Sequence, residues 1–200
     1  LHNGVLNIHI RSANAEDDRP VTFESKRNIP GYWWRYDEKG ILFVGDSDGD
    51  ENFHVRYLDL ETLAVSDLTP YEGVRATVYG YNKEQPSKML VGLNMRDGAY
   101  FDLYLLDLDT KEIALVEENQ GFLYYLVDKH LQVRGACREH EDASQTVYKK
   151  TENGDYIPLI EWAAEDIMSS TPYKFSEEGG ELFVLDTLDT NTAQLVAIDC

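Results

Sequence analysis

Gly45–Gly49 reads Gly-Asp-Ser-Asp-Gly and is the stretch most suggestive of catalysis. It matches G-x-S-x-G, the pattern that places the nucleophilic serine of many hydrolases on a strained turn between a strand and a helix. Here the strand-like run Phe53–Leu60 follows Ser47 where a helix is needed. The sequence therefore predicts a hairpin loop, and we expect no catalytic residue in this chain.

The overlapping stretch Asp46–Asn52 is rich in carboxylates, which are ligands that Ca²⁺ prefers. A calcium loop of the EF-hand type needs glycine at its sixth position and a bidentate glutamate at its twelfth. Counted from Asp46, Gly49 comes fourth and Tyr57 twelfth. We favour a solvated turn, and a calcium site of another kind is left open.

His130, Cys137 and His140 have a spacing that could contribute to a zinc site. A structural zinc ion usually takes four ligands, and the sequence offers no evident fourth. We therefore predict no metal and no other cofactor. The aromatic run Tyr32–Tyr36 could stack on a ligand, but packing between neighbouring sheets is the favoured interpretation.

Composition excludes two classes of partner. The 200 residues include 18 basic and 37 acidic side chains, for a net charge of −19. Nucleic acids are held mainly by lysine and arginine, and the chain has no basic run to supply them. No apolar stretch approaches the roughly 20 residues that cross a bilayer, so we expect neither nucleic acid nor membrane as a partner.

The elements that must position these residues are strands. Runs rich in Val, Ile, Leu, Tyr and Phe recur about every ten residues between turn signals. Glu161–Ser169 is the one stretch with the character of a short helix. The fold class predicted is all-β.

The strands also repeat. A shift of 48 residues aligns Ile41–Gly73 with Met89–Gly121, with Asp59 over Asp107 and Thr62 over Thr110. A period of about 47 residues with four strands is typical of a β-propeller blade. We expect one domain over residues 1–200, a partial propeller. Its blades are predicted at 31–70, 73–118 and 121–160, with partial blades at 1–25 and 172–200.

Several segments resemble the propeller of the prolyl oligopeptidase family, in its acylaminoacyl-peptidase-like branch. They are Asp48–His54 with its Gly-Asp-Glu-Asn, Asp67–Ala76, Val91–Arg96 with Phe101–Tyr104, Pro20–Thr22 and Tyr173–Ser176. Single pieces such as Leu-Thr-Pro also occur in TolB-like propellers. The resemblance spans nearly the whole chain.

The resemblance implies a serine peptidase in two parts. In the family an α/β-hydrolase domain carries Ser, Asp and His, and the propeller restricts which peptides enter. No catalytic residue of the family can be carried over to this chain. We expect a noncatalytic, substrate-gating propeller whose partners are a C-terminal α/β-hydrolase domain and the peptide substrate. The alternative is a TolB-like propeller that docks a protein and has no hydrolase.

Loops between the second and third strands of each blade are the places where we expect a partner or a substrate to bind. The candidates are Asp48, Asp50, Glu51, Asn52, Asn94, Arg96 and Asp102. A structural role, capping and bridging adjacent hairpins, is the competing interpretation for each of them.

Two expectations concern the protein as a whole. Only Cys137 and Cys200 occur, so no disulfide framework is predicted, and a reducing compartment such as the cytoplasm is preferred. Sheet edges left free in a partial propeller could pair two copies into a homodimer.

Overall fold

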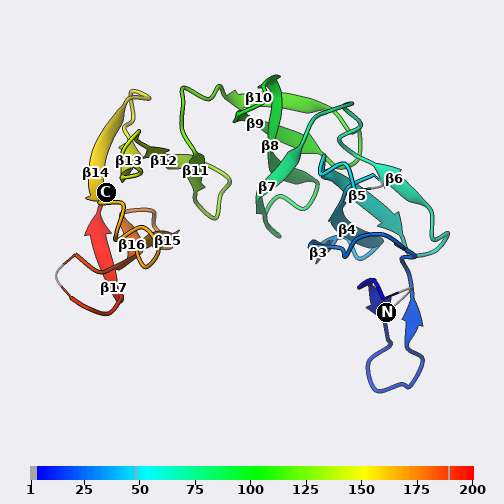
Figure 1. Cartoon of the computed structure of the whole chain (residues 1–200). Helices are drawn as coiled ribbons and strands as arrows, with labels where there is room; N and C mark the ends of the chain where they lie inside the picture. The colour runs from blue at the N-terminus through cyan, green and yellow to red at the C-terminus, as the bar shows by residue number, and fades with distance from the viewer. Residues whose placement is uncertain (1–3, 48, 189) are drawn as a thin grey trace. The chain divides into compact units, whose positions relative to one another are not determined.

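The computed structural model describes residues 4–47, 49–188 and 190–200. Every regular element in those ranges is a strand, and none is a helix (Figure 1). The all-β prediction is confirmed, and the sheets are those of a β-propeller. Within the described ranges no helix is long and apolar enough to cross a membrane.

The strands form antiparallel sheets whose order follows the chain. The first unit, Leu1–Glu117, holds a two-stranded sheet and two four-stranded ones. Their strands are β1 (His9–Ile10), β2 (Arg19–Pro20), β3 (Gly31–Trp34), β4 (Gly40–Gly45), β5 (His54–Asp59), β6 (Val65–Asp67), β7 (Ala76–Tyr81), β8 (Lys88–Asp97), β9 (Tyr100–Asp107) and β10 (Ile113–Glu117).

The second unit, Glu118–Cys200, holds one four-stranded and one three-stranded sheet. Its strands are β11 (Tyr124–Val127), β12 (Val133–Glu139), β13 (Gln145–Lys150), β14 (Tyr156–Trp162), β15 (Thr171–Phe175), β16 (Glu181–Asp186) and β17 (Gln194–Asp199). β17 is an edge strand of its sheet. Pairing of two copies through such an edge stays a prediction, which light scattering would test.

The helix expected at Glu161–Ser169 is wrong. Trp162 ends β14 and is fully buried beside Cys137 and Val147, and turns follow it. Asp166 N–H donates to Ala163 O, and the N–H groups of Ser169 and Ser170 both donate to Asp166 O. The tertiary packing of Trp162 therefore extends the strand, and the rest of the segment turns toward β15.

β4 buries both of its faces, because its sheet packs between the segment that holds Ile8 and Val21 and the β7–β10 sheet. In β4, Leu42 packs into a cluster with Met89, Val91 and Leu93 of β8. Its neighbours Ile41 and Phe43 point the other way, into a cluster with Ile8 and Val21. Side chains alternate between the faces of a strand, so a strand packed on both sides needs the unbroken apolar run that the sequence shows.

The aromatic run on β3 is only partly packed between sheets, whereas the sequence predicts such packing for all of it. Trp33 packs into the cluster formed with β8, as expected. Tyr32 and Trp34 lie opposite Phe43 and Ile41 in the register, so they share the other face of the sheet. There they are 59% and 56% exposed, because Ile8 and Val21 cover β4 but leave β3 uncovered.

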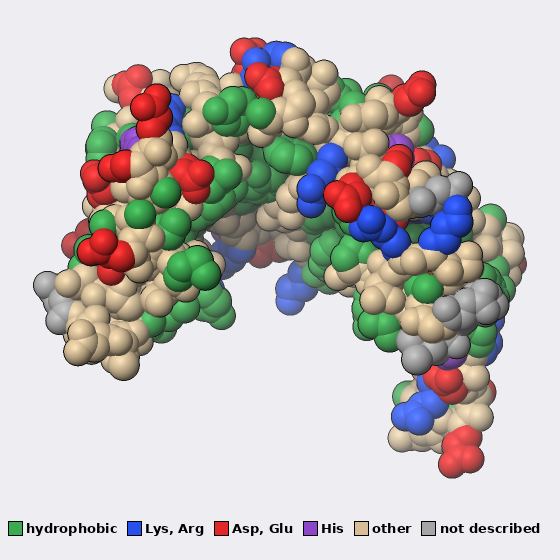
Figure 2. All heavy atoms as spheres, in the orientation of Figure 1, with side chains coloured by type: hydrophobic (Ala, Val, Ile, Leu, Met, Phe, Trp, Pro, Cys, Tyr) green, Lys and Arg blue, Asp and Glu red, His purple; other side chains and the backbone are tan. Residues whose placement is uncertain are grey.

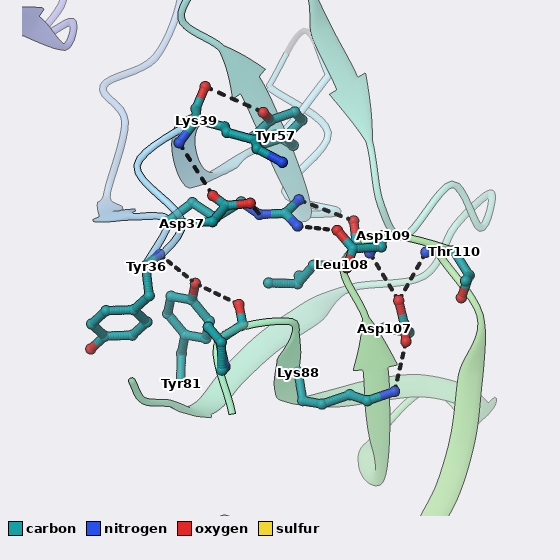
Figure 3. Close-up of polar contacts among 12 residues, drawn as sticks. Tyr36, Asp37, Lys39, Tyr57, Tyr81, Lys88, Asp107, Leu108, Asp109 and Thr110 are labelled. Atoms are coloured by element: carbon teal, nitrogen blue, oxygen red, sulfur yellow. Dashed lines mark hydrogen bonds and ion pairs between the residues drawn. The ribbon is translucent and has the colours of Figure 1, made fainter. Parts of the chain in front are cut away.

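A group of ion pairs, which we call the ionic clamp, links the two large sheets of the first unit at one edge (Figure 3). Arg35, in the β3–β4 turn, forms an ion pair with Asp109 of the β9–β10 turn, and its Nε lies 3.0 Å from Asp37 Oδ2. Its guanidinium also lies 5.4 Å from the centre of the Tyr57 ring. Beside it Lys88 Nζ donates to Asp107 Oδ2 at 2.6 Å. The clamp joins adjacent blades at what we call the turn edge, formed by the β3–β4, β5–β6, β7–β8 and β9–β10 connections.

Candidate functional site

The opposite edge of the same two sheets holds the predicted site residues. Because the strands are antiparallel, the β4–β5 loop, the connection into β7 and the β8–β9 hairpin all lie at one end of the sheets. We call this end the loop edge. Basic and acidic side chains lie side by side over the part of Figure 2 where Figure 1 places the β3–β6 sheet.

The acidic loop between β4 and β5 is largely held by its own hydrogen bonds. Asp46, 8% exposed, accepts the N–H of Glu51 at 3.2 Å. Asp50 Oδ1 accepts the N–H groups of Ser47 and Asn52. Desolvation opposes ionisation of Asp50, but donation from Asn52 and Ser47 prevails and lowers its pKa. Asp48, also a candidate, lies outside the described residues.

An arginine from before β3 completes the loop. Arg27 Nη2 donates to Glu51 Oε1 at 3.0 Å, and its Nε lies 3.5 Å from Asp46 Oδ2. Asp50 and Glu51 are exposed, and Asn52 is half-buried. Hydrogen bonds within the loop and the ion pairs with Arg27 thus hold it in place, and the side chains of Asp50 and Glu51 lie at its surface.

Ser47 lies between two strands, as predicted, and not before a helix. Its Oγ accepts a hydrogen bond from Arg56 Nη2 at 3.1 Å. Among the described residues no imidazole is hydrogen-bonded to it, and His54 Nδ1 is paired with Asp67 Oδ2 at 2.6 Å. Within that part of the chain Ser47 has a structural partner, Arg56, in place of a general base.

Asn94, Arg96 and Asp102 lie in strands, which corrects their expected placement in a loop. After a register shift that follows the Leu93–Asp102 pair, β8 and β9 pair again at Asp97 and Tyr100, so this hairpin is longer than the β4–β5 hairpin. Arg96 donates to both Asp102 oxygens, at 3.0 and 2.8 Å. Asp102 is only 2% exposed, so this bidentate pair stabilises the hairpin and leaves the carboxylate out of reach of a ligand.

Asn94 contacts Arg75, a residue that the sequence did not identify as a candidate. Its Oδ1 accepts the N–H of Arg75 at 2.7 Å, and its Nδ2 donates to Gly98 O. Arg75 is exposed, directly precedes β7, and lies with its guanidinium 5.4 Å from the centre of the Phe53 ring. Asn94 therefore fixes the backbone from which this guanidinium projects.

A cavity of about 360 Å³ opens beside Arg75, between the β3–β6 and β7–β10 sheets. Arg75 is the one charged residue among those that line it. The others are Pro30, Gly31, Trp33, Val44, Phe53, Ala76, Thr77 and Val78. An arginine just before an inner strand of a very acidic chain is the signal that could have pointed here.

The residues considered for zinc do not converge. Cys137 is buried in the second unit with its Sγ 3.7 Å from Gln145 Oε1, and burial raises the pKa of its thiol. His140 Nε2 lies 2.7 Å from Thr146 Oγ1. Over the part of the chain that the structure describes, no three His, Cys, Asp or Glu side chains are placed to hold a metal ion.

Comparison with known proteins finds relatives along almost the whole chain. It is 34% identical over 199 residues to dipeptidyl aminopeptidase BIII of Pseudoxanthomonas mexicana, a match that covers 98% of this chain and 29% of that protein. It is 28% identical over 196 residues to dipeptidyl peptidase family member 6 of Caenorhabditis elegans, covering 90% and 26%. The chain thus spans less than a third of the length of either relative.

A solved structure supports the fold independently. TolB from Acinetobacter baumannii superposes with a TM-score of 0.56 at 16% identity, over 96% of this chain and 46% of TolB. At that identity the likeness shows the fold alone. No family model matches the chain.

Proposed function

Because this chain is a propeller segment of the prolyl oligopeptidase family, we propose that it is the noncatalytic part of a serine peptidase. In this proposal it restricts the access of peptides to an α/β-hydrolase domain elsewhere in the same protein. The alternative is a TolB-like propeller that docks a protein partner and has no hydrolase.

One observation carries the proposal. The chain matches 29% of the length of a dipeptidyl aminopeptidase at 34% identity. The rest of such a protein has room for a hydrolase domain, and within the described residues the Oγ of Ser47 is bonded to Arg56 and not to an imidazole. Both facts fit a division of labour in which the catalytic groups lie outside these residues.

The loop edge is where we expect gating. Asp50 and Glu51 are exposed there on a braced loop, so they can face a peptide without losing their position. Arg96 and Asp102 are expected to act indirectly, because their ion pair links the two strands of the neighbouring hairpin.

The test compares two double variants of the longer peptidase that contains this chain. Asp50→Ala with Glu51→Ala removes two charges from the loop edge, and Glu61→Ala with Glu112→Ala removes two exposed charges from the turn edge. The readout is kcat/KM for a chromogenic dipeptide and for a long peptide. We expect the ratio of the two to change roughly threefold in the loop-edge variant alone.

Two results would overturn this function. Hydrolysis of peptides by the isolated 200 residues, lost on Ser47→Ala, would make the chain itself catalytic. Absence of a G-x-S-x-G in a strand–turn–helix context, with Asp and His after it, from the longer protein would favour the TolB-like alternative.

A further inference from the structure

The cavity beside Arg75 has the chemistry of a binding site for a carboxylate. We propose that it binds the free carboxylate of a short peptide, with the apolar side chain of the last residue inside the cavity. The identity of the ligand as a peptide rests on the proposed function, whereas the carboxylate chemistry rests on the cavity itself.

The guanidinium of Arg75 is available to a ligand. No carboxylate among residues 4–47, 49–188 and 190–200 forms an ion pair with it, although the chain carries 37 acidic side chains. Nearby arginines differ. Arg27, Arg56 and Arg96 each have a carboxylate partner.

The position of Arg75 is set in advance. Asn94 accepts its backbone N–H at 2.7 Å, and the Phe53 ring lies under the guanidinium at 5.4 Å. A cation–π contact of this kind uses none of the N–H groups of the guanidinium as a hydrogen-bond donor to an oxygen, so these groups can still donate to a ligand. A planar fork of donors matches the two oxygens of a carboxylate.

The remaining lining decides what accompanies the carboxylate. Trp33, Val44, Phe53 and Val78 give the cavity apolar walls, and Thr77 adds a hydroxyl. Its volume of about 360 Å³ is at the small end of ligand sites, large enough for one side chain. With a net charge of −19 the chain repels anions at long range, so a bound carboxylate needs direct contact with the cation.

Calorimetric titration of the 200-residue chain tests the proposal. The probes are Gly-Gly-Phe with a free carboxylate and the same tripeptide as its carboxamide. We expect saturable binding of the acid and binding of the amide weaker by roughly tenfold or more, since a hydrogen-bonded charge is lost. Added salt should weaken binding of the acid and leave binding of the amide little changed.

Matched variants assign the effect to one residue. Arg75→Gln should abolish the preference for the acid over the amide, and Arg75→Lys should keep part of it. Arg11→Gln makes the same change of charge at an exposed arginine outside the cavity lining and should behave as the wild type. Circular dichroism checks the fold of each variant. If Arg75→Gln fails to fold, the difference in affinity between the acid and the amide, measured on the wild type, still tests the proposal.

The outcomes are distinct. Equal affinity for acid and amide in the wild type, or an unchanged preference in Arg75→Gln, overturns the carboxylate site. A third probe, acetyl-Phe-Asp-amide, carries a carboxylate only on its Asp side chain. Binding of this probe as tight as that of Gly-Gly-Phe overturns the assignment to a peptide terminus. No hydrolysis is involved, so loss of this inference leaves the gating test untouched, and the converse also holds.

Discussion

Arg35 and Arg75 occupy opposite edges of the same two blades and have opposite surroundings. Arg35 is 8% exposed, carries two carboxylate partners and lies over the Tyr57 ring. Burial alone would lower its pKa, but Asp109 and Asp37 prevail and raise it. Arg75 also lies over a ring, that of Phe53, but has no carboxylate partner in the described part of the chain and borders a cavity.

The turn edge of these two blades is the one built for stability. A cation with its counter-charges in place holds adjacent blades together, whereas a cation kept without them is free for a ligand. Disturbing the turn edge should therefore reduce stability, and disturbing the loop edge should change binding.

Gly40→Ala should show the largest loss of stability. A Cβ at Gly40 would lie 2.3 Å from the Leu58 carbonyl oxygen and 2.3 Å from the Tyr57 ring, and the backbone carbonyl cannot move away. We expect a loss of about 3 kcal/mol in the free energy of unfolding, measured by urea denaturation. Gly98→Ala, in the β8–β9 turn with nothing within 4 Å, is the control and should stay within about 0.5 kcal/mol. Equal losses at the two glycines would contradict the comparison.

Arg35→Met against Arg75→Met tests the two arginines directly. Met keeps apolar bulk but leaves Asp37 and Asp109 without their cation, so we expect a loss of about 2 kcal/mol. The same change at exposed Arg75 should cost less than about 0.5 kcal/mol. Urea midpoints of both variants give the answer, and a larger loss at Arg75 would reverse the roles assigned to the two edges.

Asp107→Asn should give a smaller, pH-dependent effect at the turn edge. Hydrogen bonds from Lys88 Nζ and then from the Thr110 N–H hold the pKa of Asp107 well below its ordinary value. A carboxyl whose pKa is depressed on folding stabilises the protein above its unfolded pKa, about 3.9, and loses that stabilisation as the pH falls through the folded value. We expect the variant to cost about 1 kcal/mol at neutral pH.

The pH series is the measurement for Asp107. The gap in unfolding free energy between wild type and variant should be constant down to about pH 5 and should shrink below about pH 4. A gap that does not change with pH would mean that the ionised carboxylate contributes nothing to stability.

The strands and the repeat could be predicted from the sequence because they depend on local patterns of residue types. The apolar run Ile41–Val44 and the turn residues around it were enough to predict β4 and its neighbours. The length of each hairpin was not accessible. A gapless shift of 48 places Asp46 over Asn94, yet one lies in a loop and the other in a strand. The cross-strand pair Asp97–Tyr100, which involves a residue of another strand, extends β8 past Asn94 and decides that difference.

The cavity at Arg75 could not be predicted for a similar reason. Its walls come from β3, from β4, from the residue before β5, and from β7, so it exists only once two sheets have packed. The sequence also places Arg75 among ordinary charged residues, and only its position beside the cavity, without a carboxylate partner among the described residues, distinguishes it.

The identities that revealed the repeat turn out to be structural. Asp59 accepts the N–H groups of Glu61 and Thr62, and Asp107 accepts those of Asp109 and Thr110. Both turns then end in a left-handed residue, Leu63 at φ 57° and Lys111 at φ 64°. The repeat thus preserves the chain reversals of the turn edge, and the proposed binding residue Arg75 lies elsewhere.

The smallest predicted effect is a gain in stability at one of these turns. Lys111 adopts a left-handed conformation that costs a side-chain-bearing residue about 1 kcal/mol and glycine almost nothing. Lys111→Gly should therefore raise the free energy of unfolding by roughly 0.5 kcal/mol, after the greater entropy of glycine in the unfolded chain is counted. The control is Lys83→Gly, in a turn without positive φ, which should lower it by a similar amount. Thermal denaturation of the two variants measures both signs. A loss at both positions would mean that Lys111 makes contacts that outweigh its strain, and that the turn edge is closed by more than its ion pairs and capped turns.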